Sequence, residues 1–157
     1  MTEFVQFANE QFIELTINWL VWGMFVFMLM WSTYTDATEM KIENNFNKFL
    51  VISRIILIPL FPMDWWDLLG GIILFTLFLI IGMITNDGKM AGDIKYSGAF
   101  GLWAGFHLGL LSVLAGVLII IPVSLIRSKL SKGEQTPLAP FIAIGTILIL
   151  FITQIYS

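Results

Sequence analysis

Two aspartates stand at the ends of long apolar stretches, where ionisable side chains are unusual. Asp36 follows an apolar stretch that ends at Tyr34, and Asp93 lies in a polar turn directly before another apolar stretch. Two carboxylates about 3 Å apart cannot both ionise easily, so such a pair shares one proton. One carboxyl group can then activate a water as a base while the other protonates a carbonyl oxygen. Hydrolysis of a peptide bond is the chemistry that such a pair could carry out, and the alternative on spacing alone is that both are simply acids of interfacial loops.

The composition predicts that these aspartates belong to a membrane protein. Hydrophobic residues make up 58% of the 157 residues and charged residues 12%, which is far from the composition of a soluble domain. The chain has no cysteine, which excludes disulfides, thiolate nucleophiles and cysteine-bound zinc. The first apolar stretch has no preceding lysine or arginine, so we expect a retained helix and not a signal peptide. We predict a single all-α, polytopic membrane domain over residues 1–157.

The lengths of the apolar stretches predict about six transmembrane helices, because about 20 residues of helix cross a bilayer. The apolar stretch after Asp93 is too long for one crossing, so we expect it to break near Gly105. Asn44 is a candidate N-cap for the second helix. The predicted spans are residues 12–34, 45–61, 68–84, 93–103, 106–126 and 137–155.

Lysine and arginine gather in three of the predicted loops, while the opposite loops contain only acids. By the positive-inside rule, we expect the three basic loops in the cytoplasm and both termini on the other side. Asp36 and Asp93 would then both lie at the cytoplasmic face. The basic loop residues are Lys41, Lys48, Lys89, Lys95, Arg127, Lys129 and Lys132.

Two further polar residues need an explanation. Arg54 lies inside the second predicted span, where a charge requires a partner or must reach the interface; Glu14 and Asn18 are both possible partners. His107 has no second metal ligand near it in the sequence. We therefore predict no metal site and no cofactor.

Four segments, in this order, resemble those of the type IV prepilin peptidases, a family of GxGD-type membrane aspartyl proteases. Asp36 ends the first span, and Lys41-Ile42-Glu43-Asn44 resembles the family's basic-Ile-Pro-Asn segment. Gly92-Asp93-Ile94-Lys95 resembles the GxGDxK segment, and Pro137-Leu138-Ala139-Pro140-Phe141 resembles the Pro-x-x-Pro-Phe opening of the last span. Two positions differ: Met90 stands where the first glycine is usual, and Glu43 where proline is common.

The resemblance implies that Asp36 and Asp93 are the catalytic pair. It also implies supporting roles for the other motif residues, which are Gly92, Lys95, Asn44, Pro137 and Pro140. Larger family members carry a zinc-binding domain with four cysteines and N-methyltransferase activity. We expect that domain to be absent here, so the chain resembles the short, peptidase-only members.

The reaction implied is removal of a short basic leader from a prepilin-like precursor (a pilin, pseudopilin or archaellin) just before its apolar helix. It would take place at the cytoplasmic face of the cell membrane, with lipid as the surroundings and no nucleic acid involved. Glu39, Glu43 and Asp87 could attract the basic leader, although such charges are more often simply solvated. Lys95 could steady a negative charge beside Asp93, or could serve only as a topology signal.

Two other functions stay open at this point. The chain could be a small transporter or scaffold in which Asp36 and Asp93 relay protons or bind cations, but transporters more often place such acids at the membrane midplane and show repeat symmetry. It could also be a catalytically inactive relative, an interpretation for which Met90 is the hint. The sequence names neither the substrate nor the oligomeric state, and it leaves open whether the two aspartates meet at rest.

Overall fold

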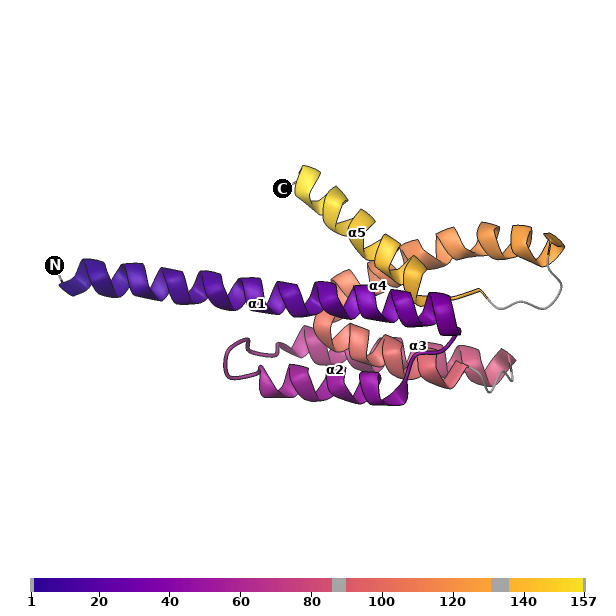
Figure 1. The fold of residues 1–157 in the computed structure, drawn as a ribbon, viewed down its shortest axis with the longest axis horizontal. Coiled ribbons are helices and arrows are strands. Elements are labelled where there is room, and N and C mark those ends of the chain that lie inside the picture. Colours follow the sequence, from indigo (N-terminus) through magenta and orange to yellow (C-terminus); the bar gives the residue numbers. More distant parts are fainter. Residues whose placement is uncertain (1, 86–89, 131–135, 157) are drawn as a thin grey trace.

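The computed structural model describes residues 2–85, 90–130 and 136–156. Within that part of the chain every regular element is a helix, so the predicted all-α class is confirmed (Figure 1). In chain order the helices are α1 (Thr2–Glu39), α2 (Asn44–Ile56), α3 (Trp65–Thr85), α4 (Ala91–Leu130) and α5 (Ala139–Tyr156).

Among the described residues, two helical stretches are long and apolar enough to cross a bilayer. They are Trp65–Ile84 in α3 and Ala91–Ile126 in α4, and Ala139–Thr153 in α5 is a shorter apolar helix. Large apolar side chains on these helices point outward: Ile84 is 78% exposed and Leu118 is 72% exposed. Such surfaces suit a surrounding of lipid, because a soluble protein rarely leaves extended apolar patches in water. The count of six spans and the orientation of the termini stay predictions.

The first two helices differ in extent from the predicted spans. Helix α1 is continuous from Thr2 to Glu39, and its N-terminal part extends past the other helices (Figure 1). Helix α2 ends at Ile56, five residues before the predicted end, and a turn follows it. The physical reason is the pair Pro59 and Pro62, because a proline disfavours helical conformation in the residue before it.

The predicted N-cap of the second helix was wrong by one residue. Glu43 occupies the cap position, with φ −62° and ψ 137°, and its side chain makes no capping hydrogen bond. Asn44 is the first residue of α2, and its Oδ1 accepts a hydrogen bond from Lys95 Nζ at 2.9 Å. A tertiary contact therefore uses the oxygen that we expected to cap the helix.

The predicted break in the long apolar stretch is confirmed at Gly105. Its φ of 71° and ψ of 176° interrupt α4 and separate two helical segments. A positive φ is readily adopted by glycine, which has no Cβ. The backbones of α3 and α4 also touch here, since a Cβ added to Gly70 would lie 2.6 Å from the carbonyl carbon of Gly105.

Helix α4 is the centre of the bundle and contacts α2, α3 and α5, while α5 also packs against α1. Small residues allow the closest approach, because a Cβ on Gly116 of α4 would lie 2.7 Å from the carbonyl oxygen of Phe141 in α5. Between α1 and α4 the core is aromatic: Phe25 stacks on Phe100, which stacks on Tyr96. These contacts bring the end of α1, the start of α4 and the start of α5 together.

Candidate functional site

The two predicted catalytic aspartates line one cavity of about 890 Å³. Asp36 comes from the last turn of α1 and Asp93 from the first turn of α4. The segment before α5 closes another side of the cavity through Thr136, Pro137 and Leu138. Residues far apart in the sequence therefore meet at a single site, at the end of the bundle where α1 ends and α4 begins (Figure 1).

Helix α5 holds the carboxyl group of Asp36 in place. The backbone N–H of Ala139, the first residue of α5, donates to Asp36 Oδ2 at 2.7 Å. Asp36 is only 4% exposed, and this burial raises the pKa of its carboxyl group, while the N–H groups of Ala139 and Leu138 act in the opposite direction. The net effect is a raised pKa, so protonated Asp36 is favoured over a wider pH range than in water.

A buried pair of hydroxyl groups joins α1 to α4 beside the aspartates. Ser32 lies one helical turn before Asp36, and Tyr96 lies one turn after Asp93. Their hydroxyl oxygens are 2.8 Å apart, and both side chains are fully buried. Because each residue is one turn from an aspartate on the same helix, this bond fixes where the two acids lie relative to each other along the helix axes. We did not identify Ser32 or Tyr96 from the sequence, although polar residues one turn from an acid in an apolar helix were a usable signal.

The start of α4 is also tied to α2 and the loop before it. Asn47 Nδ2 donates to the carbonyl oxygen of Gly92 at 3.3 Å, and Lys95 binds Asn44 as described above. A Cβ added to Gly92 would lie 3.1 Å from the carbonyl oxygen of Ile42. Glycine therefore suits position 92, where the α1–α2 loop approaches the backbone closely.

The other predicted site residues are divided between the cavity and its surroundings. Glu39 lines the cavity, whereas Glu43 is exposed and is not among the lining residues. Pro137 lines the cavity, and Pro140 lies half-buried in the first turn of α5 outside that lining. Asp87 lies outside the described residues.

Met90, which replaces the usual glycine, fits the cavity wall without backbone strain. Among the described non-glycine residues only Met40 has a positive φ, so Met90 has an ordinary backbone conformation. Its side chain packs against the hydrophobic core, and the residue lines the cavity. Glycine is therefore not required at position 90 by the conformation of this loop.

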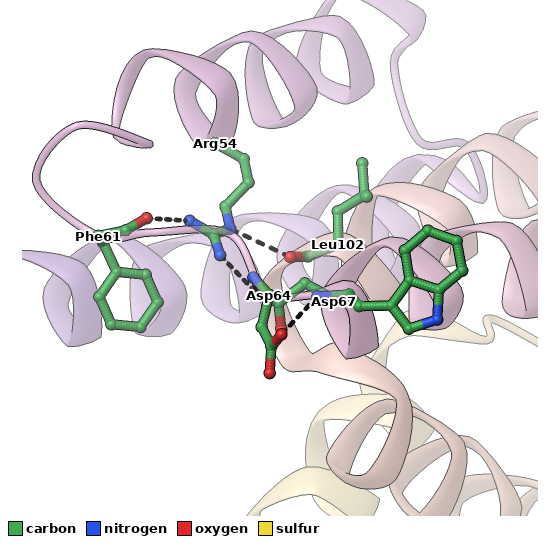
Figure 2. A network of polar contacts seen from close by, with 6 residues as sticks. Arg54, Phe61, Asp64, Asp67 and Leu102 are labelled. Atoms are coloured by element: carbon green, nitrogen blue, oxygen red, sulfur yellow. Dashed lines mark hydrogen bonds and ion pairs between the residues drawn. The ribbon is translucent and has the colours of Figure 1, made fainter.

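At the opposite end of α2, Arg54 is buried in a polar network (Figure 2). Its guanidinium donates to the carbonyl oxygens of Leu102 and Phe61 and forms an ion pair of 2.7 Å with Asp67 Oδ2. From the sequence we considered Glu14 and Asn18, whose side chains lie outside the described part of the structure, and not Asp67. The turn between α2 and α3 brings Asp67 back to Arg54, an arrangement that the span assignment did not predict.

His107 packs against the ring of Trp66, with centroids 5.1 Å apart. Among the residues that the structure describes, no group of three or more His, Cys, Asp and Glu side chains could hold a metal ion.

The fold and the cavity define a class: a helical protein with membrane-length apolar helices and two buried or half-buried acids around one cavity. Residues 23–125 match the type IV leader peptidase family, and the chain belongs to this family. The matched region includes Asp36 and Asp93 but ends before the Pro137 segment. Family membership and the apolar helices together support a membrane protein.

A characterised relative is the prepilin leader peptidase/N-methyltransferase of Bacillus subtilis (strain 168). It is 33% identical to this chain over 135 residues, which cover 80% of this chain and 52% of that protein. The chain thus spans about half the length of this relative. No solved structure matches the chain significantly.

Proposed function

We propose that this chain is a membrane aspartic endopeptidase that removes the basic leader from a prepilin-like precursor at the cytoplasmic membrane face. Membership of the type IV leader peptidase family supports a leader peptidase. The observation that carries the aspartic mechanism is that Asp36 and Asp93, from different helices, line the same cavity. A carboxyl group with little exposure to water is costly, so a buried and a half-buried acid around one cavity favour a functional role.

In the proposed mechanism the two carboxyl groups share one proton. Asp36 is the more buried acid, and burial raises its pKa, so we assign the proton to Asp36, which donates it to the oxygen of the scissile carbonyl. Asp93 acts as the base: it takes a proton from a water whose oxygen attacks the carbonyl carbon. That proton then passes to the leaving amide nitrogen as the C–N bond breaks, and one hydroxyl group of the tetrahedral intermediate returns a proton to Asp36. The products are a carboxylic acid and an amine, and both aspartates regain their starting protonation states.

Two hydrogen bonds close to the aspartates suit this chemistry. The Ala139 N–H binds Oδ2 of Asp36 and so fixes the orientation of its carboxyl group. The hydrogen bond between Ser32 and Tyr96 holds α1 against α4, so it limits changes in the separation of the acids. Positioning of reacting groups in this way contributes strongly to catalysis.

Charge around the cavity fits a basic leader. Glu39 lines the cavity together with the two aspartates, so three carboxyl groups lie within reach of a bound peptide. Lys41 and Lys95 also line it, and the hydrogen bond to the neutral amide of Asn44 leaves the Lys95 ammonium charged, so attraction of a basic leader comes from individual carboxylates and not from the net charge of the cavity. We therefore assign leader attraction to Glu39 and to the ionised Asp93.

The proposal is tested by comparing the wild type with Asp36→Asn and Asp93→Asn on a prepilin-like precursor in detergent. Asparagine keeps the shape of the side chain but cannot transfer the proton, so each variant should lose at least about 100-fold in activity. Asp64→Asn is the matched control, because Asp64 is an exposed acid in the turn between α2 and α3, away from the cavity lining. Thermal unfolding checks that each variant is folded. Activity within a few fold of wild type in either cavity variant would refute the aspartic mechanism.

A further inference from the structure

A second hollow, of about 510 Å³, lies between α2, α3 and α4. Its walls are mainly apolar and are formed by Val51, Ile52, Leu68, Ile72, Phe75 and Leu102. On α3 the lining residues extend from Leu68 to Thr76, which corresponds to about 12 Å of helix, or about two turns. We call this hollow the apolar groove.

The apolar groove adjoins the cavity that contains the two aspartates. Asn44 and Lys95 line both hollows, so the hydrogen-bonded pair that they form stands at the junction. On one side of this junction the lining contains Asp36, Glu39 and Asp93 together with Lys41, and on the other side it is mainly apolar, with Lys48 as a charged member. The two adjoining hollows therefore differ in the same sense as the two parts of a precursor, which has a charged leader followed by an apolar helix.

We propose that the apolar groove binds the first two turns of the precursor's apolar helix while the leader occupies the acidic cavity. This inference rests on the proposed function and adds a binding surface to it. A helix in the groove would bury apolar side chains against α2 and α3, and the peptide segment next to the junction would pass the aspartates. The precursor would thus be held on both sides of the bond that is cleaved.

Asn47 supplies a polar contact at the same junction. It lines the groove and is 3% exposed, and its Nδ2 donates to the carbonyl oxygen of Gly92. Its Oδ1 is buried and has no hydrogen-bond partner among the described residues. A buried acceptor without a partner is costly. A rotation of the Asn47 amide toward the groove would let Oδ1 accept an N–H from the peptide backbone, which is free where the peptide is extended near the scissile bond.

The first test narrows the groove and compares two substrates. Ile52 and Thr76 are exposed lining residues, so Ile52→Trp and Thr76→Trp place bulk in the groove without entering the core. One substrate is a precursor with its complete apolar helix. The other is a peptide that contains the leader, the cleavage site and two apolar residues. For the long precursor, KM should rise about tenfold with kcat unchanged, because contacts of about one apolar side chain are lost. Cleavage of the short peptide should not change.

Leu77→Trp is the matched control, because Leu77 is on α3 and exposed but does not line the groove. It should leave KM for both substrates at the wild-type value. The proposal would be overturned if the groove variants changed KM equally for the long and the short substrate. It would also be overturned if Leu77→Trp raised KM for the long precursor as much as the groove variants do. If wild type cleaved neither substrate, the proposed function itself would fail. The second test would then decide whether the groove binds the apolar helix.

The second test measures occupancy without cleavage. A photoreactive phenylalanine analogue replaces Ile72 in the groove or Leu77 outside it, in the Asp93→Asn background and with phospholipid present. The Ile72 position should crosslink to the apolar helix of the precursor, and the Leu77 position should not. Crosslinks from Ile72 to phospholipid only, unchanged when precursor is added, would show that an acyl chain occupies the groove and would overturn the proposal.

Discussion

At the scale of single residues, Arg54 shows how this chain accommodates a buried charge. It is one of the largest fully buried side chains, and all three of its guanidinium nitrogens donate hydrogen bonds (Figure 2). The guanidinium also lies over the ring of Phe61, with 4.9 Å between Cζ and the centroid. These contacts compensate the loss of water around the charge, so the network stabilises the junction of α2, α3 and α4 only while it is complete.

We expect Asp67→Asn and Arg54→Met each to destabilise the protein by roughly 3 kcal/mol, because each leaves a buried polar group without its charged partner. Thermal unfolding in detergent measures the loss. Lys48→Met is the control, since Lys48 is exposed and removal of its charge should change the Tm little. A loss no larger than that of the control would show that the ion pair does not contribute to stability.

The raised pKa of Asp36 leads to a prediction for the pH dependence of stability. In the folded state this pKa lies above its ordinary value of 3.8, so the folded protein binds the proton more tightly than the unfolded chain does. Stability from this group is therefore present at low pH and is lost as pH rises above 3.8 toward the folded pKa. Asp36→Asn cannot titrate, but it keeps an oxygen for the Ala139 N–H. Relative to this variant, the wild-type Tm should fall as the pH rises above 3.8 through the folded pKa. A constant or opposite difference would contradict the prediction.

At the scale of helices, small residues determine how closely the elements pack. A Cβ on Gly70 would lie 2.6 to 2.7 Å from backbone atoms of Gly105 and Phe106 in α4, and helix backbones cannot yield as a flexible side chain can. A Cβ on Gly23 of α1, in contrast, would have no neighbouring atom within 4 Å. The two glycines therefore offer a matched pair.

We expect Gly70→Ala to destabilise the protein by about 2 kcal/mol through overpacking. Gly23→Ala should instead be neutral or stabilise it by up to about 1 kcal/mol, because alanine favours helix over glycine. The Tm of both variants in the same detergent gives the comparison. If the two substitutions had the same effect, close contact of α3 with α4 would not be the reason for glycine at position 70.

The α1–α2 loop has a backbone conformation that suits proline. Glu43 has φ −62°, which is the angle that a proline ring imposes, and its N–H makes no described hydrogen bond. Glu43→Pro should therefore raise stability by about 0.5 kcal/mol by restricting the unfolded chain. Glu43→Gln removes the charge without changing the backbone, so it separates the two effects in Tm and in activity. A fall in Tm for Glu43→Pro alone would show that the loop does not tolerate proline.

At the scale of the whole molecule, the arrangement of the loops sets which face of the membrane the cavity opens toward. The α1–α2 loop lies at the end of the bundle where α3 ends and α4 begins, while the turn between α2 and α3 lies at the opposite end (Figure 1). The lysines near the cavity therefore predict a cytoplasmic site by the positive-inside rule. This orientation is a prediction that labelling can test.

The absence of cysteine makes that test direct. Lys41→Cys and Asp64→Cys place single thiols at exposed positions near the two ends of the bundle. In intact cells a membrane-impermeant maleimide should label the Asp64→Cys variant only, and permeabilisation should expose the Lys41→Cys variant. The reverse pattern would invert the proposed orientation, and labelling of both variants in intact cells would place both loops outside.

Local sequence patterns were sufficient to predict the helices, the break in α4 and the two candidate aspartates. Apolar stretches are helical because hydrocarbon leaves backbone groups no other partners, and the break at Gly105 follows from a length that one crossing cannot contain. The two aspartates were identifiable because an acid at the end of an apolar stretch is exceptional. Each of these inferences depends only on neighbours in the chain.

Contacts between distant segments required the tertiary structure. The bond from Ala139 to Asp36, the pairing of Ser32 with Tyr96 and the use of Asn44 by Lys95 each join different helices or the segments that flank them. Apolar helices of similar composition can pack in many arrangements, because hydrophobicity alone does not select a partner among them. Backbone contacts at glycines and a few buried hydrogen bonds make that selection, so only the folded chain shows that the two acids line one cavity.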